Sequence, residues 1–121
     1  MAAIVFPCAE FVDQDAEYGS HFNRFLLRLM TFDAAMVDRT LAGRYNEGYQ
    51  RCLSDMRRLM PGHSRPTQSR RFIFLGTYLS SLLAQREAML RDLVSDHPTW
   101  RSAEMLDDIV RTGAAILAAP A

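Results

Sequence analysis

The last third of the chain carries more apolar and small side chains than a helix needs to cover one neighbour. The excess runs through RRFIFLGTYLSSLLAQREAMLRDLV, residues 70–94, and returns in SAEMLDDIVRTGAAILAAP, residues 102–120. A helix that packs on a single partner needs an apolar stripe of only about 100°. These two segments therefore predict closing helices with two packing surfaces each.

On a helical wheel, the first of these segments has an arc of large apolar side chains and a second strip of mostly small ones. The final segment has an apolar half and a charged half. Gly113 lies in the apolar half, where glycine costs about 1 kcal/mol relative to alanine, so we expect a close contact there. The alternative is that the terminal helix is buried within its own subunit.

We favour a homodimer in which the last two helices of each chain form a four-helix bundle. The predicted dimer-interface residues are Ile73, Thr77, Ser81, Ala84, Ala88, Met105, Ile109, Gly113 and Ile116.

Proline, glycine and polar clusters divide the 121 residues into about five helices. The expected helices cover about 2–14, 20–30, 33–59, 67–95 and 99–118. Thr31 or Asp33 is expected to cap the third helix and Thr67 the fourth. The β-like runs IVF and FIF lie inside stretches with helical periodicity. The sequence thus predicts one all-α domain over residues 1–121, with its helices in an orthogonal-to-antiparallel bundle.

Charge and cysteine content exclude several classes of function. Fourteen arginines balance fourteen acidic residues, and lysine is absent. Balanced charge gives no general attraction to nucleic acid or to an anionic membrane, and Schiff-base chemistry on lysine is excluded. Cys8 and Cys52 are too few for a disulfide framework, and the N-terminal segment lacks the features of a signal peptide or membrane span. We expect a reduced, cytoplasmic protein.

Motifs for catalysis and cofactor binding are absent. The sequence contains no nucleophile elbow, no glycine-rich phosphate loop and no HExxH. Its three histidines, His21, His63 and His97, lack metal-ligand spacing with one another or with either cysteine. We therefore expect no catalytic residues, no metal and no cofactor.

The order of the segments resembles the C-terminal ligand-binding and dimerisation domain of TetR-type transcriptional regulators. The pieces GSHFNRFLLRLM, LLAQREA and MLDDIVRTGAAIL carry the resemblance, which covers nearly the whole chain. It implies a domain in which a small hydrophobic ligand shifts the arrangement of a dimer and thereby the DNA affinity of the intact regulator. DNA contact would require a helix-turn-helix domain, and no segment here has the basic recognition helix of one.

The resemblance also implies a ligand cavity between the early helices and the third and fourth helices. Methionine adapts its shape to a ligand, and tyrosine offers a hydroxyl group within an apolar wall. The candidate ligand-binding residues are Phe22, Phe25, Met36, Tyr45, Tyr49, Met56, Phe74, Tyr78 and Arg86. Packing in an ordinary core is the alternative for the apolar members of this set.

Arg86 differs from the others because it falls inside the apolar arc of its helix. It would bind an acidic ligand, pair with a carboxylate, or extend to solvent. A basic cluster around the turn PGHSRP could bind phosphate or an acidic partner, or it could be a solvated turn between two helices. Its members are Arg57, Arg58, His63, Arg65, Arg70 and Arg71.

Two other classes of function stay open. One is a helical protein-interaction module, which would recruit a different chain to an exposed apolar face. The other is a small all-α dimeric enzyme, which would require Arg24, Arg28 and Arg86 to converge with a carboxylate in one cavity.

Overall fold

Every regular element in the described part of the chain is a helix, which confirms the all-α fold. The computed structural model describes residues 1–14, 21–42 and 46–120, without the side chains of residues 11–14 and 41. The helices are α1 (Ala2–Gln14), α2 (Phe22–Phe32), α3 (Ala34–Leu41), α4 (Glu47–Arg58), α5 (Arg65–Leu90), α6 (Pro98–Arg101) and α7 (Glu104–Ala118).

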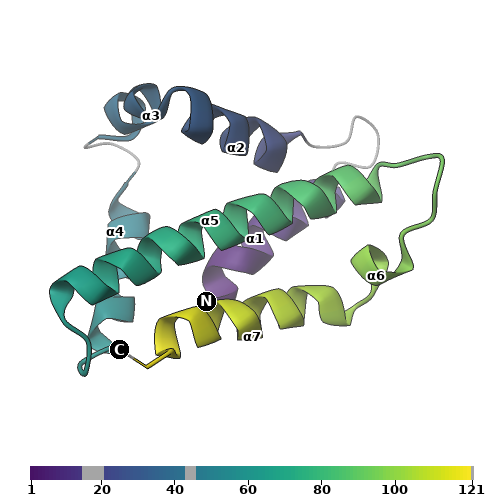
Figure 1. The fold of residues 1–121 in the computed structure, drawn as a ribbon. Helices are drawn as coiled ribbons and strands as arrows, with labels where there is room; N and C mark the ends of the chain where they lie inside the picture. The colour runs from purple at the N-terminus through teal and green to yellow at the C-terminus, as the bar shows by residue number, and fades with distance from the viewer. Residues whose placement is uncertain (15–20, 43–45, 121) are drawn as a thin grey trace.

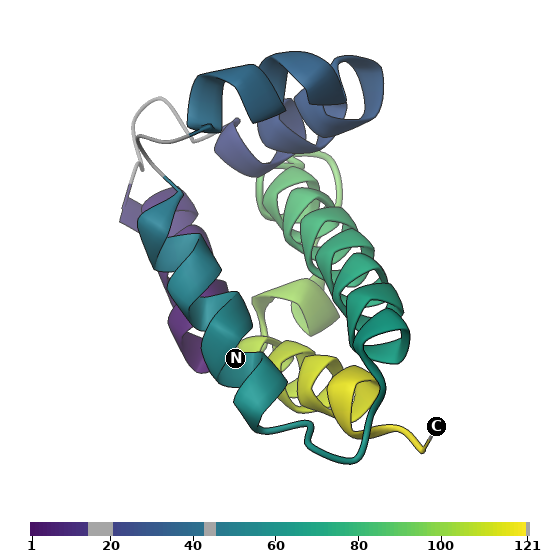
Figure 2. The ribbon, with the colours of Figure 1, turned by 90° about the vertical axis from the view of Figure 1, so that its left-hand side faces the viewer.

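The long helix α5 is the element around which the others are arranged. It packs against α2 on one side and against α7 on another, and α7 runs antiparallel to it (Figure 1). Figure 2 shows α1 and α4 facing α5 from across the molecule, with α2 and α3 at one end of this arrangement and α7 at the other. The all-α arrangement is therefore built around α5, with α2 and α7 as its main neighbours.

The core is small and is centred on one face of α5. Leu75, Leu79 and Leu83 repeat every four residues, so they share one face of that helix. Val5 of α1, Met56 of α4 and Ile109 of α7 meet them there. The arc of large apolar side chains predicted for residues 70–94 therefore packs against other helices of the same chain.

Two of the five expected helices are interrupted. Asp33 begins α3 as predicted, because its carboxylate accepts a hydrogen bond from the backbone N–H of Met36 at 2.9 Å. The expected helix over 33–59 is, however, two helices, α3 and α4. The expected helix over 99–118 is likewise divided into α6 and α7.

The ends of α5 also differ from the prediction. Ser64, rather than Thr67, caps the helix, and its hydroxyl accepts a hydrogen bond from the Thr67 N–H at 3.3 Å. Pro66 in the first turn fits this earlier start because proline lacks only an N–H that the helix leaves unbonded. At the other end, α5 stops at Leu90, short of the expected residue 95.

Asp92 organises the turn that follows α5. Its carboxylate is 2.7 Å from His97 Nε2 and accepts a hydrogen bond from the Val94 N–H at 2.8 Å. The hydrogen bond with His97 and the backbone N–H groups hold the pKa of Asp92 below its ordinary value. Asp92 is therefore ionised at neutral pH, where it can hold the turn.

A bilayer-spanning segment would need a long, strongly apolar helix, and the helices in the described ranges include none of that kind.

Candidate functional site

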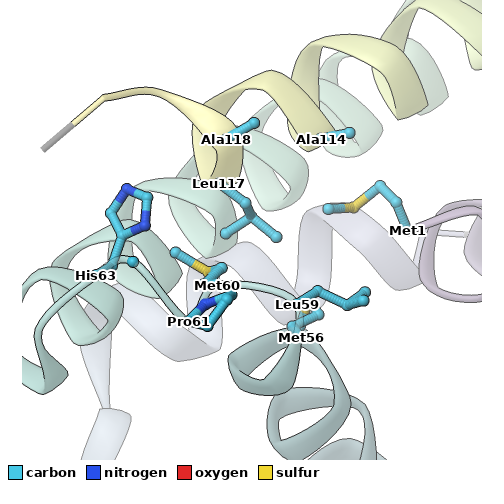
Figure 3. Close-up of a pocket in the computed structure, with 10 residues that line it drawn as sticks. Met1, Met56, Leu59, Met60, Pro61, His63, Ala114, Leu117 and Ala118 are labelled. Carbon is cyan, nitrogen blue, oxygen red and sulfur yellow. The ribbon is translucent and has the colours of Figure 1, made fainter.

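A cavity of about 500 Å³ lies at the end of the bundle where α4 turns into α5 and where α7 ends (Figure 3). Leu117 of α7 points toward the turn that carries Met60 and Pro61. The exposed turn residues leave the cavity open to solvent. The lining residues are Met1, Met56, Leu59, Met60, Pro61, Gly62, His63, Ala114, Leu117 and Ala118. We call this site the methionine cavity.

The wall formed by the α4–α5 turn is held by a buried amide. The Gln68 side chain is 6% exposed, and its Nε2 donates to the Met60 carbonyl oxygen at 2.9 Å. Its Oε1 accepts from Arg57 Nη1 at 3.3 Å, and the Arg57 guanidinium lies over the Phe72 ring, 4.7 Å from the centroid. These contacts satisfy backbone groups of the turn and fix the position of Met60.

The opposite wall depends on Gly113. A Cβ atom at Gly113 would lie 3.2 Å from Leu75 Cδ1 and 3.4 Å from Met1 Sδ. The close contact expected at this glycine therefore exists, but it is made with α5 and the N-terminal residue of the same chain. It places the Met1 side chain beside α7.

Two basic side chains hold the segment that follows α7. His63 Nε2 is 2.9 Å from the Ala119 carbonyl oxygen, and Arg71 Nη2 donates to the Pro120 carbonyl oxygen at 2.9 Å. Arg71 Nη2 also reaches the Ala119 oxygen at 3.4 Å. We call Ala119 and Pro120 the strap, because these bonds hold the two residues beside the cavity.

The lining has the chemistry of a binding site for a small apolar molecule. Three thioethers with flexible side chains adapt to different shapes, and the volume lies within the range of small-molecule sites. His63 is the one titratable side chain among the lining residues.

The predicted ligand-binding residues are mostly placed elsewhere. Met56 alone among them lines the methionine cavity, and Tyr78 packs against the core. Tyr45 lies outside the described residues. The remaining aromatic and methionine candidates are exposed side chains on four helices: Phe22, Phe25, Met36, Tyr49 and Phe74.

Met1, Met60 and Pro61 were missed as cavity residues. The available signal was the Pro61–Gly62 turn directly after Met60. The contribution of Met1 has no local signal, because it depends on the approach of the two ends of the described chain.

A buried carboxylate lies next to Arg86, the arginine that the sequence placed inside the apolar arc of its helix. Glu87 is 0% exposed, accepts a hydrogen bond from the Asn23 N–H at 2.9 Å and pairs with Arg24 Nε at 3.2 Å. Arg86 itself is 9% exposed, so its side chain does not extend freely into solvent. Arg28 is exposed, whereas the enzyme alternative requires it to share one cavity with Arg24 and Arg86.

The predicted dimer-interface residues divide into three groups. Ile73 is 65% exposed and Thr77 is also exposed, so both present surface on α5. Half-buried positions with surface remaining are Ser81, Ala88, Met105 and Ile116.

Three of the predicted interface residues have almost no surface left for a second subunit. Ala84, Ile109 and Gly113 are buried within the single chain. Ala84 lies one turn before Glu87, which binds α2, and Ile109 belongs to the core. The small-residue strip of α5 therefore lies partly against α2 of the same chain, and these three positions pack internally in the single chain.

The environment of Cys8 does not activate its thiol as a nucleophile. Both cysteines are free thiols, and burial raises the pKa of the Cys8 thiol, which keeps it protonated at neutral pH. Within the described ranges, no group of three or more His, Cys, Asp or Glu side chains is placed to hold a metal ion.

The family model for the tetracyclin repressor-like, C-terminal domain matches residues 2–115. The chain therefore belongs to this family of TetR-like C-terminal domains. Neither a curated protein nor a solved structure gives a significant match to the chain.

Proposed function

We propose that this chain is the regulatory domain of a TetR-like transcriptional regulator that acts in the cytoplasm. In this proposal it binds a small, mainly apolar ligand in the methionine cavity and forms a homodimer through the outer face of α5 and the adjoining edge of α7. DNA is contacted by a helix-turn-helix domain of the intact regulator. Family membership supports the regulatory role.

The observation that carries the proposal is that α7 contributes to both features. Ala114, Leu117 and Ala118 of α7 line the cavity, while Met105 and Ile116 of the same helix keep surface for a partner. A ligand that prefers one spacing between α7 and the α4–α5 turn would shift the population of dimer arrangements. The coupling free energy between ligand and DNA would be the difference in ligand affinity for those arrangements.

Sedimentation equilibrium at tens of micromolar tests the dimer. We expect the wild-type chain to be dimeric and Ile73→Arg to weaken the dimer by about tenfold or more, because the arginine would bury a charge at the interface. Phe32→Arg is the matched control: Phe32 is also an exposed apolar residue, but it lies at the end of α2. Circular dichroism establishes that each variant remains helical.

A wild-type monomer that is fully folded under these conditions would contradict the proposed dimer. Equal weakening by Ile73→Arg and Phe32→Arg would place the contact elsewhere than on the outer face of α5.

A further inference from the structure

The methionine cavity lies beside the most basic stretch of the chain. Residues 56–72 contain five arginines and His63, and no aspartate or glutamate. Arg58 bonds to Asp55, just before this stretch, and Arg70 donates to Thr67 Oγ1 at 3.0 Å. An apolar cavity with arginine side chains close to it is complementary to a molecule with an apolar body and a negative head group.

Two donors converge on the Ala119 carbonyl oxygen beside the cavity, and one of them, His63, also lines the cavity. A carbonyl oxygen can only accept, so His63 must donate its Nε2–H to the Ala119 oxygen. Arg71 Nη2 reaches that same oxygen and the Pro120 oxygen. A carboxylate accepts stronger, charge-assisted bonds from such donors than a neutral carbonyl does, and arginine can bind both of its oxygens.

We propose that the methionine cavity selects an apolar molecule with a single carboxylate, and that this carboxylate replaces the strap carbonyls on Arg71 and His63. The inference rests on the proposed function and adds the chemical class of the ligand. The apolar body lies against Met56, Met60 and Leu117, and the carboxylate lies at the rim. The strap directly follows α7, so its release changes the end of a helix that the proposed dimer uses.

We expect the ligand to be a free acid from solution rather than a lipid head group of a membrane, because of where the two donors lie. Both donors are half-buried and face carbonyl oxygens of the strap, whereas Arg58, Arg65 and Arg70 are exposed. A monomeric acid can bring its head group to this position while its chain enters the apolar space. A membrane surface would present its head groups to the exposed arginines instead.

Isothermal titration with decanoate and decanol, each below its aggregation concentration, tests the proposal. The two probes have the same chain and differ in the head group. We expect the wild-type chain to bind decanoate about tenfold more tightly than decanol, because the carboxylate gains charge-assisted bonds. This ratio is measured on the wild-type chain and does not depend on the folding of a variant.

Two matched variants locate the head group. Arg71→Gln should weaken decanoate binding by about tenfold and leave decanol binding unchanged, because only the carboxylate uses that guanidinium. Arg70→Gln removes the same charge one residue away and should leave the affinities for both probes nearly unchanged. In nuclear magnetic resonance spectra, decanoate should shift the backbone signals of Ala118 and Ala119.

Equal affinity for decanoate and decanol would overturn the carboxylate class and leave the cavity as an apolar ligand site. Equal losses for Arg70→Gln and Arg71→Gln would overturn the assigned head-group position. Binding to phosphatidylglycerol vesicles without binding to monomeric decanoate would overturn the free-acid source. The proposed dimer is measured separately by sedimentation, so its failure is distinguishable from each of these results.

Discussion

At the scale of single residues, Glu87 joins three helices. Its carboxylate binds the backbone of Asn23 and the side chain of Arg24 in α2. Asn23 Nδ2 in turn donates to the Cys8 carbonyl oxygen of α1 at 3.3 Å. A fully buried carboxylate is stable only with such partners, so the docking of α2 against α5 depends on them.

The two members of this ion pair should respond unequally to neutralisation. Arg24→Gln leaves the Glu87 charge buried with one partner fewer, and we expect a loss of about 3 kcal/mol in the free energy of unfolding. Glu87→Gln leaves the cation on a side chain that is 38% exposed and therefore hydrated, so we expect a loss of about 1 kcal/mol. Urea denaturation of both variants at neutral pH gives the comparison; equal losses would show that Arg24 does not compensate the buried charge.

Glu87 was not predicted from the sequence, although its neighbour Arg86 was. The helical wheel placed Arg86 among leucines, which marked it as unusual. The burial of Glu87 results from the approach of α2, and that approach depends on partners 63 and 64 residues away in sequence. Periodicity within α5 contains no information on such a contact.

At the scale of elements, the sequence predicted where helices exist better than where they end. Apolar spacing identified the helical segments and Asp33 identified a cap, because both signals are local. Thr67 was mistaken for the cap of α5 because it precedes the apolar run, whereas Ser64 is the residue with the capping hydrogen bond. The separation of α3 from α4 and of α6 from α7 was missed because helical periodicity in the sequence continues across short breaks.

The two glycines inside α5 and α7 should behave differently when replaced by alanine. A Cβ at Gly76 meets nothing within 4 Å, so Gly76→Ala should stabilise the chain by about 0.5–1 kcal/mol through helix propensity. At Gly113 the same gain is opposed by the 3.2 Å approach to Leu75 Cδ1. We expect Gly113→Ala to be less stabilising than Gly76→Ala in urea denaturation and to leave the dimer dissociation constant unchanged.

A large increase in that dissociation constant for Gly113→Ala would contradict the internal placement of Gly113. A destabilised Gly76→Ala variant would show that α5 lies closer to another element, or to a second subunit, than it does in the single chain.

At the scale of the whole molecule, stability should be graded away from α5. This helix contributes Leu75, Leu79 and Leu83 to the core, while Val37 is the only half-buried residue among the described side chains of α3. In native-state hydrogen exchange, we expect the amides around Leu79 to be protected about a hundredfold more strongly than those of α3, because they are exposed only by global unfolding. Equal protection would indicate that a surface outside the single chain covers α3.

The arrangement of the whole molecule also explains why the methionine cavity could not be predicted from the sequence. The dimer surface stays a prediction, and two of the residues named for it, Ile73 and Thr77, are exposed on α5. The methionine cavity was not predictable, because it joins Met1 and Met56 to Ala114 and Leu117, which are far apart in sequence. No repeat or periodic spacing connects these positions.

The bond between Arg24 and Glu87 has a consequence for how this sequence can diverge. If Arg24 is replaced first, the Glu87 carboxylate stays buried without its cation. If Glu87 is replaced first, the Arg24 guanidinium stays accessible to water. Exchange of the pair for neutral residues is therefore easier in one order than in the other. Among descendants, positions 24 and 87 should covary, and the intermediates that survive should be those in which position 87 changed first.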